Sequence, residues 1–280
     1  MLTRNILFTV LLFLTHLHMN AQTSAPNGHY ATVNGLKLYY EIQGNGTPLI
    51  LLHGGGSTIS STFGRIWPLL LPGHQLIGVE SQSHGRTADR DTPSSFEQDA
   101  DDVAALLQHL HIEKADFMGF SNGATTCLQI AIRHPQLVGK LVLCAVAYRR
   151  DGMIPGFFEG MEQATLANMP QELQQAYLAV NPSQEGLQRM FHRDSQRMIH
   201  FKDIPDTALK AIHAPALLIH ADQDVILTSS VLTLSHTLPH ARLAVLPGIH
   251  GECIGEIATS HPDPQTLAFV TAMIQKFLKE

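Results

Sequence analysis

The sequence predicts an α/β fold: a mostly parallel, twisted sheet with helices on both faces, an antiparallel N-terminal hairpin and an inserted helical cap. Two observations carry this prediction. Short apolar segments alternate with helical patterns along most of the chain, as in a parallel sheet that helices cover on both sides. The alternation is interrupted once, in the second half, by a stretch with helical patterns alone. The length of 280 residues suits one large domain with such an insertion.

The first 21 residues are expected to be a signal peptide outside the fold. Arg4 gives a positive start, residues 6–14 are almost wholly apolar, and Ala21 is the small residue after which cleavage is expected. The apolar core is shorter than a membrane-spanning helix requires. We therefore expect a periplasmic or secreted protein with no stable membrane span after signal removal. A retained N-terminal anchor is the alternative.

The fold is expected to begin with a hairpin and a buried strand. Residues 29–33 and 36–43 alternate apolar and polar side chains around Asn34-Gly35. An Asn-Gly pair between two strand-like segments is a strong hairpin signal. Residues 48–52 form a short apolar run of the kind found in buried parallel strands.

Strands and helices are then expected to alternate through the rest of the first half. Strands are predicted at residues 75–79, 115–119 and 137–145, and helices at residues 95–110 and 122–133. Ser95 is suited to cap the first of these helices, because its hydroxyl can accept an N–H group of the first turn.

The cap is predicted at residues 147–213, and the core domain at residues 22–146 and 214–280. Strand patterns vanish inside the cap, where helical patterns appear around residues 157–168, 171–180 and 185–192. Beyond it, strands are expected at residues 216–220 and 241–246, and helices at residues 229–238 and 264–279.

The composition argues against several classes of protein. With 44% hydrophobic and 15% charged residues, the chain is typical of a folded protein rather than a disordered one. A net charge of −6 argues against binding to nucleic acid or to an anionic membrane, since both need a basic surface. The 17 histidines show no metal-ligand spacing, so no metal site is expected. Cys127, Cys144 and Cys253 are interpreted as small buried side chains, with a Cys127–Cys144 bridge as the alternative.

The segment Gly119-Phe120-Ser121-Asn122-Gly123 lies between a predicted strand and a predicted helix. The pattern Gly-x-Ser-x-Gly is weak alone, but in this context a sharp strand-to-helix turn explains it. The turn strains the serine backbone and lifts its hydroxyl clear of the sheet, while the glycines leave room for the crowded chain. The pattern therefore indicates a nucleophilic serine.

A nucleophilic serine needs a base that an acid holds in place. His250 follows a late predicted strand, and Asp222 and Asp224 follow the strand before it. Because parallel strands end at the same edge of a sheet, Ser121, one of these aspartates and His250 can converge although they are far apart in sequence.

These motifs, in this order, resemble the α/β-hydrolase superfamily over residues 28–280. The resemblance implies that the acid is Asp224, three positions after the small residue Ala221 that closes its strand. Asp222 is the nearby competitor. Asp151 is a third candidate, because some relatives carry the acid after the preceding strand.

Two further loops share the resemblance. His53-Gly54-Gly55-Gly56 is similar to the loop that supplies backbone donors to an oxyanion in this superfamily. The resemblance implies that the N–H groups of Gly55 and Asn122 form the oxyanion hole, with Gly54 as the alternative donor if the register differs. The loop at residues 80–87 also resembles a superfamily loop, to which we assign a scaffolding role.

Substrate contacts are predicted for Gly54, Phe120, Phe157 and Phe158. The aromatic and methionine side chains of the cap suggest a pocket for an apolar acyl or aromatic group. The alternative is that these side chains form the core of the cap itself.

The resemblance implies a serine hydrolase that cleaves a carboxylic ester or similar acyl bond of a small molecule through an acyl-enzyme. No metal and no organic cofactor are expected. An aminopeptidase, a lactonase, a perhydrolase or a carbon–carbon bond hydrolase would use the same triad. A non-catalytic small-molecule-binding protein on a hydrolase scaffold is the alternative of another class. The natural substrate and the oligomeric state are left open.

Overall fold

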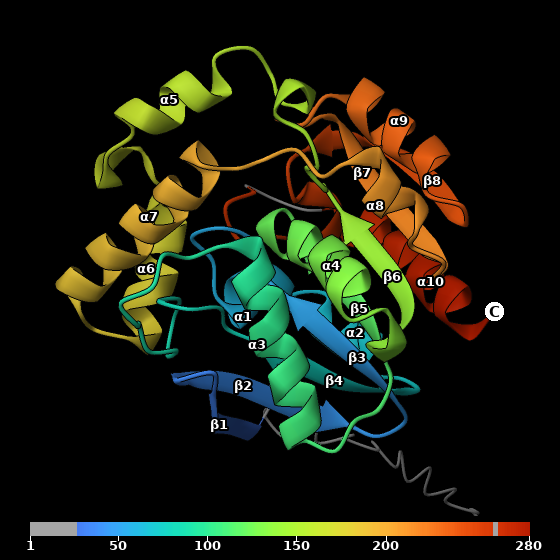
Figure 1. The fold of residues 1–280 in the computed structure, drawn as a ribbon, viewed down its shortest axis with the longest axis horizontal. Helices are drawn as coiled ribbons and strands as arrows, with labels where there is room; N and C mark the ends of the chain where they lie inside the picture. The colour runs from blue at the N-terminus through green and yellow to red at the C-terminus, as the bar shows by residue number, and fades with distance from the viewer. Residues whose placement is uncertain (1–26, 260–262) are drawn as a thin grey trace, which may run out of the picture.

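The computed structural model describes residues 27–259 and 263–280, so the expected signal peptide lies outside the described residues. Within them, eight strands form one sheet in the order β1-β2-β4-β3-β5-β6-β7-β8 (Figure 1). The strands are β1 (Asn27–Val33), β2 (Leu36–Gly44), β3 (Thr47–Leu52), β4 (His74–Val79), β5 (Ala115–Phe120), β6 (Val138–Cys144), β7 (Ala216–Gln223) and β8 (Ala241–Ile249). Neighbours from β4 to β8 are parallel, whereas β2 is antiparallel to both β1 and β4. The predicted fold class is confirmed.

The hairpin forms where the Asn-Gly pair predicts it. Asn34 and Gly35 lie between Val33 and Leu36, which pair with each other, and have φ angles of 47° and 76°. Positive φ at both central residues is the requirement of the tight turn that matches the twist of a two-stranded ribbon.

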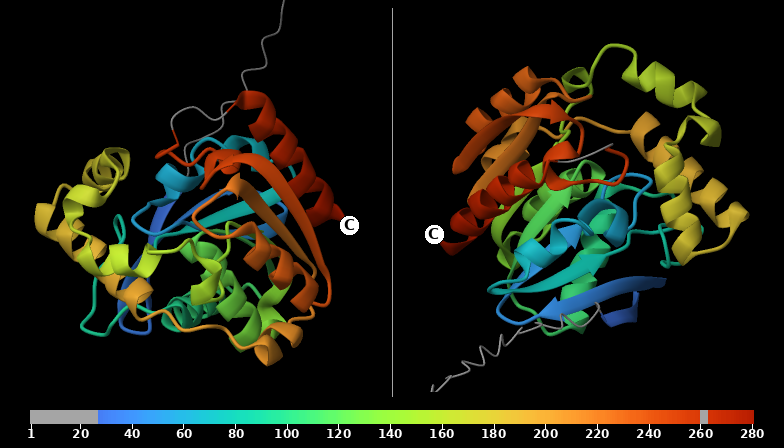
Figure 2. Two further views of the ribbon diagram at one scale, coloured as in Figure 1. Left: turned by 90° about the horizontal axis from the view of Figure 1, so that it is seen from above. Right: turned by 180° about the vertical axis from the view of Figure 1, so that it is seen from behind.

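Helices cover both faces of the sheet (Figure 2). One face carries α3 (Phe96–His109), α4 (Asn122–Arg133), α8 (Asp206–Lys210) and α9 (Thr228–Thr237), and the other carries α1 (Ile59–Phe63), α2 (Trp67–Leu70) and α10 (Pro264–Lys279). The central strands are therefore buried on both sides; Leu49, Ile50 and Leu51 of β3 are fully inaccessible. This is why their sequence is continuously apolar rather than alternating. The Ser95 side chain accepts the Gln98 N–H at the start of α3.

The segment between β6 and β7 contains α5 (Phe157–Gln163), α6 (Gln171–Val180) and α7 (Gln184–Ile199) as well as α8. The first three lie together to one side of the sheet, whereas α8 packs against α4 and α9 (Figure 1). The cap helices have an apolar cluster of their own, built from Met169, Leu173, Tyr177, Leu187 and Met190. That cluster bears out part of the expectation that cap methionines serve packing.

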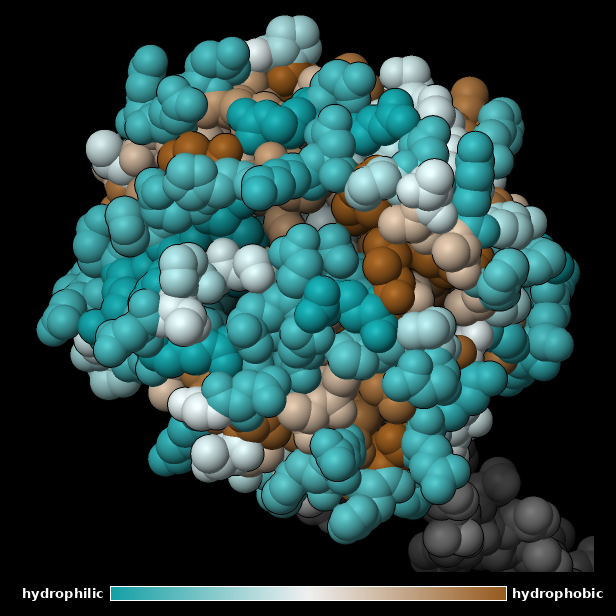
Figure 3. Space-filling model, in the orientation of Figure 1, coloured by the Kyte–Doolittle hydropathy of each residue, from teal (hydrophilic) through white to brown (hydrophobic). Residues whose placement is uncertain are grey.

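The surface is mostly polar on the face drawn in Figure 3, where hydrophobic residues form separate patches. Among the described helices, none combines the length and apolar character needed to cross a bilayer. The three cysteines are buried and unpaired, which agrees with their interpretation as small core side chains.

Candidate active site

Ser121 lies at the turn between β5 and α4 with a strained backbone. Its φ angle is +52° and its ψ angle −118°, and its N–H donates to the Cys144 carbonyl at 2.9 Å. The flanking glycines are sterically required. A Cβ atom on Gly119 would lie 2.3 Å from the Gly123 carbonyl oxygen, and one on Gly123 would lie 2.0 Å from the Leu52 carbonyl oxygen. The turn that the motif predicts is therefore formed, with the serine held at its apex.

The structure brings Ser121, His250 and Asp224 together. The His250 Nε2 atom lies 3.1 Å from the Ser121 Oγ atom, and His250 Nδ1 lies 2.8 Å from Asp224 Oδ1. The Asp224 side chain is fully buried, and its Oδ1 also accepts the Ile226 N–H at 2.9 Å. These contacts fix the aspartate and orient the imidazole, so that His250 can accept a proton from the serine.

The two competing aspartates lie elsewhere. Asp222 Oδ1 accepts the Gly248 N–H at 2.9 Å, so its carboxylate holds the end of β8, two residues before His250, instead of contacting the ring. Asp151 lies in an exposed turn. Among the aspartates weighed from the sequence, Asp224 is the one that touches His250.

The glycine loop after β3 has one backbone N–H that is free to bind an oxyanion. The Gly54 N–H donates to Thr62 Oγ1 at 3.3 Å, and the Gly56 N–H donates to Asp194 Oδ2 at 2.5 Å. The Gly55 N–H has no acceptor within the described part of the chain, and Gly55 lines the cavity at Ser121. The same holds for the Asn122 N–H at the start of α4. Two unpaired N–H groups thus flank the serine, and the register with Gly55 rather than Gly54 is the one that leaves a donor free.

A cavity of about 340 Å³ opens at Ser121 between the core and the cap. Its wall is mainly apolar and includes Met153, Phe157, Met161, Phe191, Met198 and Ile226. The polar side chains on the wall come from Asn122, Asn168, Asp194 and Ser195, besides Ser121 and His250. Neither lysine nor arginine contributes to this wall among the described residues. The cavity is suited to an apolar group next to the nucleophile.

Of the four residues predicted to contact substrate, the cavity wall includes Phe157 alone. The Phe120 ring instead packs against the His250 ring, with centroids 4.7 Å apart. Gly54 lies close to Phe120, since a Cβ atom on Gly54 would be 2.8 Å from the Phe120 ring. The Phe158 ring is covered by the Arg150 guanidinium at 3.5 Å. Phe120 therefore supports His250, Gly54 lies against Phe120, and neither lines the pocket.

Sequence reasoning missed a buried acid from the cap. Asp194 on α7 reaches the loop after β3, and its Oδ2 atom lies 2.9 Å from His84 Nε2 in addition to accepting the Gly56 N–H. Arg197 and Asp99 are buried beside this pair, with Arg197 Nη1 3.0 Å from Asp99 Oδ2. The carboxylates of Asp194 and Asp99 thus lie beside the His84 imidazole and the Arg197 guanidinium. No spacing signal marks Asp194, because an acid among basic residues on a helix has the pattern of a solvated face.

The protonation of this cluster follows from its contacts. Burial alone would raise the pKa of Asp194, but the charge and hydrogen bond of His84 hold it well below its usual range. Burial alone would lower the pKa of His84, but the Asp194 carboxylate outweighs it and raises that pKa. Burial and then the neighbouring His84 lower the pKa of His53 to about 3. Of these two histidines, His84 is therefore charged and His53 is neutral.

No group of histidine, cysteine or acidic side chains in the described residues has the arrangement of a metal site.

A family model described as alpha/beta hydrolase fold matches residues 47–193. The chain is 26% identical to a 2-hydroxymuconate semialdehyde hydrolase from a Pseudomonas species, over 84% of this chain and 90% of that protein. It is 28% identical to the human serine hydrolase BPHL, over 69% of this chain and 68% of that protein.

Among solved structures, a meta-cleavage product hydrolase from Pseudomonas fluorescens IP01 superposes with a TM-score of 0.75. That match covers 90% of this chain and 97% of the other at 22% sequence identity, so it speaks for the fold.

Proposed function

Because the chain belongs to the α/β-hydrolase fold family, whose relatives are hydrolase enzymes, we propose that it is a serine hydrolase that cleaves a carboxylic ester or similar acyl bond. The observation that carries the proposal is the hydrogen-bonded line from Ser121 Oγ through His250 to Asp224, at 3.1 Å and 2.8 Å. The human relative named as a serine hydrolase supports the same chemistry.

The proposed reaction has two steps. His250 accepts the Ser121 proton as the hydroxyl oxygen attacks the substrate carbonyl, and the Asp224 carboxylate stabilises the imidazolium that forms. The N–H groups of Gly55 and Asn122 hold the negative oxygen of the tetrahedral intermediate. His250 then protonates the leaving alcohol, which departs and leaves an ester on Ser121. In the second step His250 takes a proton from water as the water oxygen attacks that ester, and then gives the proton to Ser121 Oγ, which departs and releases the acid.

The character of the cavity supports a neutral substrate with an apolar acyl group. The Pseudomonas relative is named for 2-hydroxymuconate semialdehyde, a compound that carries a carboxylate group. The cavity wall of this chain offers such a group an acid, Asp194, and no lysine or arginine among the described residues. An unpaired carboxylate in an apolar site would carry a large desolvation cost.

Carbon–carbon bond hydrolysis is the second candidate function. The similarity to the 2-hydroxymuconate semialdehyde hydrolase favours this function, since the match covers most of both chains. The charge of the cavity wall argues against it for substrates that keep a free carboxylate.

A substrate panel compared between wild type and Ser121→Ala tests the proposed function. Nitrophenyl esters of acetate and hexanoate, a lactone, an amino-acid amide and a dienone carboxylate cover the competing classes. We expect hydrolysis of the esters and a loss of at least about 10³-fold in Ser121→Ala. A fluorophosphonate probe should label wild type and not the variant. A folded protein that is inert to the panel and to the probe would instead support a binding protein.

Export is proposed as well, because the N-terminal pattern of charge and apolar core is that of a signal peptide. Expression of the full chain in a bacterium followed by intact-mass measurement tests it. A periplasmic or secreted product that begins at Gln22 is expected, and a product that retains residues 1–21 would contradict cleavage.

A further inference from the structure

The cap helix α7 contributes one carboxylate to the core at the candidate active site. Asp194 Oδ2 accepts the Gly56 N–H at 2.5 Å and lies 2.9 Å from His84 Nε2, so one oxygen serves donors from two core loops. The residue is only 8% exposed. Since neither donor belongs to the cap, the contact links the cap to the loops beneath it.

The peptide between Gly55 and Gly56 has few other restraints. At its carbonyl end, Gly55 accepts a single hydrogen bond within residues 27–259 and 263–280, a long one from Ser57 Oγ at 3.4 Å. At its N–H end it has the 2.5 Å bond to Asp194. Gly56 also has a φ angle of +68°, in a region that glycine enters and leaves freely. The short bond to Asp194 is therefore the main restraint on the orientation of this peptide.

The partner of Asp194 is built to keep the carboxylate ionised and in place. Both ring nitrogens of His84 face oxygen acceptors, namely the Gln82 carbonyl at 2.9 Å and Asp194 Oδ2 at 2.9 Å. Two such contacts require both nitrogens to carry a proton. The resulting imidazolium balances the carboxylate inside a buried site, where an isolated charge would be costly.

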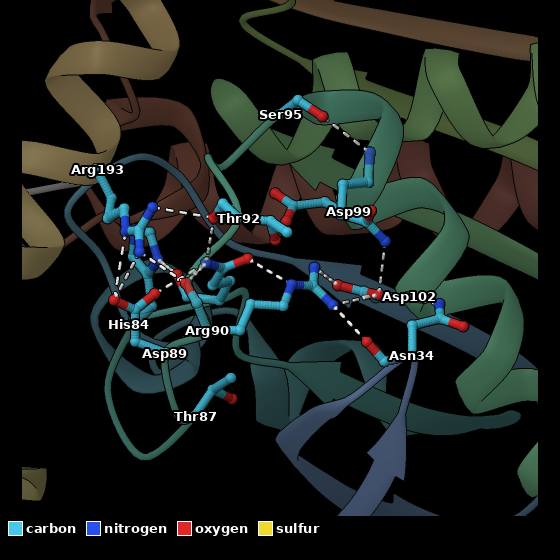
Figure 4. Close-up of polar contacts among 12 residues, drawn as sticks. Asn34, His84, Thr87, Asp89, Arg90, Thr92, Ser95, Asp99, Asp102 and Arg193 are labelled. Atoms are coloured by element: carbon cyan, nitrogen blue, oxygen red, sulfur yellow. Dashed lines mark hydrogen bonds and ion pairs between the residues drawn. The ribbon is translucent and has the colours of Figure 1, made fainter.

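A separate contact holds the same helix against the core. Arg193 lies 3.0 Å from Asp89 Oδ2 and donates to the carbonyls of Arg90 and Thr92 (Figure 4). These contacts involve residues 89–92 and do not reach the glycine loop. Docking of α7 and orientation of the Gly55–Gly56 peptide are thus served by neighbouring but different side chains, which allows them to be separated by substitution.

We propose that Asp194 is a positioning residue for the serine hydrolase reaction proposed above. Its carboxylate holds the Gly56 N–H and so fixes the Gly55–Gly56 peptide. The Gly55 N–H belongs to the preceding Gly54–Gly55 peptide, and its direction toward the developing oxyanion depends on the rotation of the Gly55 backbone between these two peptides, which the bond to Asp194 restricts. The effect belongs to the transition state, because the negative oxygen exists only after attack by Ser121. The substrate does not contact Asp194 for this role.

The test is a comparison of kcat and KM for a nitrophenyl ester among full-length wild type, Asp194→Ala, Asp194→Asn and Arg193→Gln. In Asp194→Ala we expect kcat to fall by about 10–100-fold with KM nearly unchanged, below the cost of removing an oxyanion donor outright. Asp194→Asn keeps a carbonyl oxygen that can accept the Gly56 N–H, so it should recover most of the lost kcat. Arg193→Gln removes the ion pair to Asp89 and the bonds to the Arg90 and Thr92 carbonyls, none of which reaches the glycine loop, and should keep a kcat near that of wild type.

Several results would overturn the proposal. An unchanged kcat in Asp194→Ala, a rise in KM alone, no recovery in Asp194→Asn, or an equal loss in Arg193→Gln would each do so. If Asp194→Ala fails to fold, Asp194→Ser takes its place, because its shorter side chain leaves the Gly56 N–H without an acceptor. Ser121→Ala, measured in parallel, separates the two proposals: its retained activity would overturn both, whereas its inactivity beside a fully active Asp194→Ala would overturn only this one.

Discussion

Asp222 and Gly248 are joined by a hydrogen bond of 2.9 Å from the Gly248 N–H to the Asp222 carboxylate. The bond connects the end of β7 to the end of β8, two residues before His250. It gives the acid nearest to Asp224 in sequence a role of its own, which is to fix the chain just before His250. Two aspartates separated by one residue thus act on the same segment in different ways.

The first prediction separates these two acids. Asp224→Asn should lower kcat by about 10³–10⁴-fold, because an amide no longer stabilises the imidazolium and favours the wrong tautomer of the ring. Asp222→Asn keeps an oxygen for the Gly248 N–H and should stay within a few-fold of wild type. Steady-state kinetics on a nitrophenyl ester measure both. A larger loss in the Asp222 variant would reverse the assignment.

The second prediction concerns steric crowding behind the nucleophile. A Cβ atom on Gly123 would lie 2.0 Å from the Leu52 carbonyl oxygen, and the backbone cannot yield there without shifting β3. Gly123→Ala should therefore destabilise the fold by about 3 kcal/mol or more. Gly160→Ala is the matched control, since a Cβ atom on this α5 residue would meet nothing within 4 Å. It should stabilise by up to about 1 kcal/mol. Urea denaturation measures both, and equal effects would contradict the argument.

The fold was accessible to sequence reasoning because its signals are local. The Asn34-Gly35 turn, the continuous burial of β3 and the Gly-x-Ser-x-Gly turn each depend on neighbouring residues. Ser121 and His250 could be placed at one edge because parallel strands carry their following loops there.

Other features of the site depend on contacts between distant segments. Asp194 meets Gly56 across 138 positions, and nothing in the pattern of α7 marks that face as buried. Phe120 was predicted to contact substrate, but its position in the turn places the ring against His250. The difference between Gly55 and Gly54 depends on which N–H groups of the loop already have an acceptor, such as Thr62 for Gly54, and the local sequence does not specify these partners.

The third prediction is a pH dependence of stability. Glu80 follows β4 with a fully buried side chain, and burial raises its pKa from the ordinary 4.5 to about 7, against the lowering effect of Arg86. Because the folded-state pKa is raised, the protonated acid contributes stability that is fully present below pH 4.5 and is lost as the pH rises through about 7.

Glu80→Gln removes this titration, so wild type should lose stability relative to the variant between those two pH values. The difference should change by roughly 3 kcal/mol at most, from the free energy of one pKa unit. Urea denaturation of both proteins at half-unit steps from pH 4.5 to 8 measures it. A difference that stays constant over this range would show that Glu80 does not titrate there.

The last prediction concerns the size of the acyl group. Ala164 lies on the wall of the 340 Å³ cavity, at the end of α5, where a larger side chain would project into the space beside the nucleophile. Ala164→Phe should lower kcat/KM for a nitrophenyl octanoate by about tenfold or more, while the acetate, which needs less of the cavity, should change only a few-fold. Ala164→Ser conserves the size of the side chain and should keep the wild-type ratio of the two esters. Equal losses for both esters in Ala164→Phe would place the acyl group elsewhere, because a blocked acyl pocket discriminates by length and a disturbed catalytic centre does not.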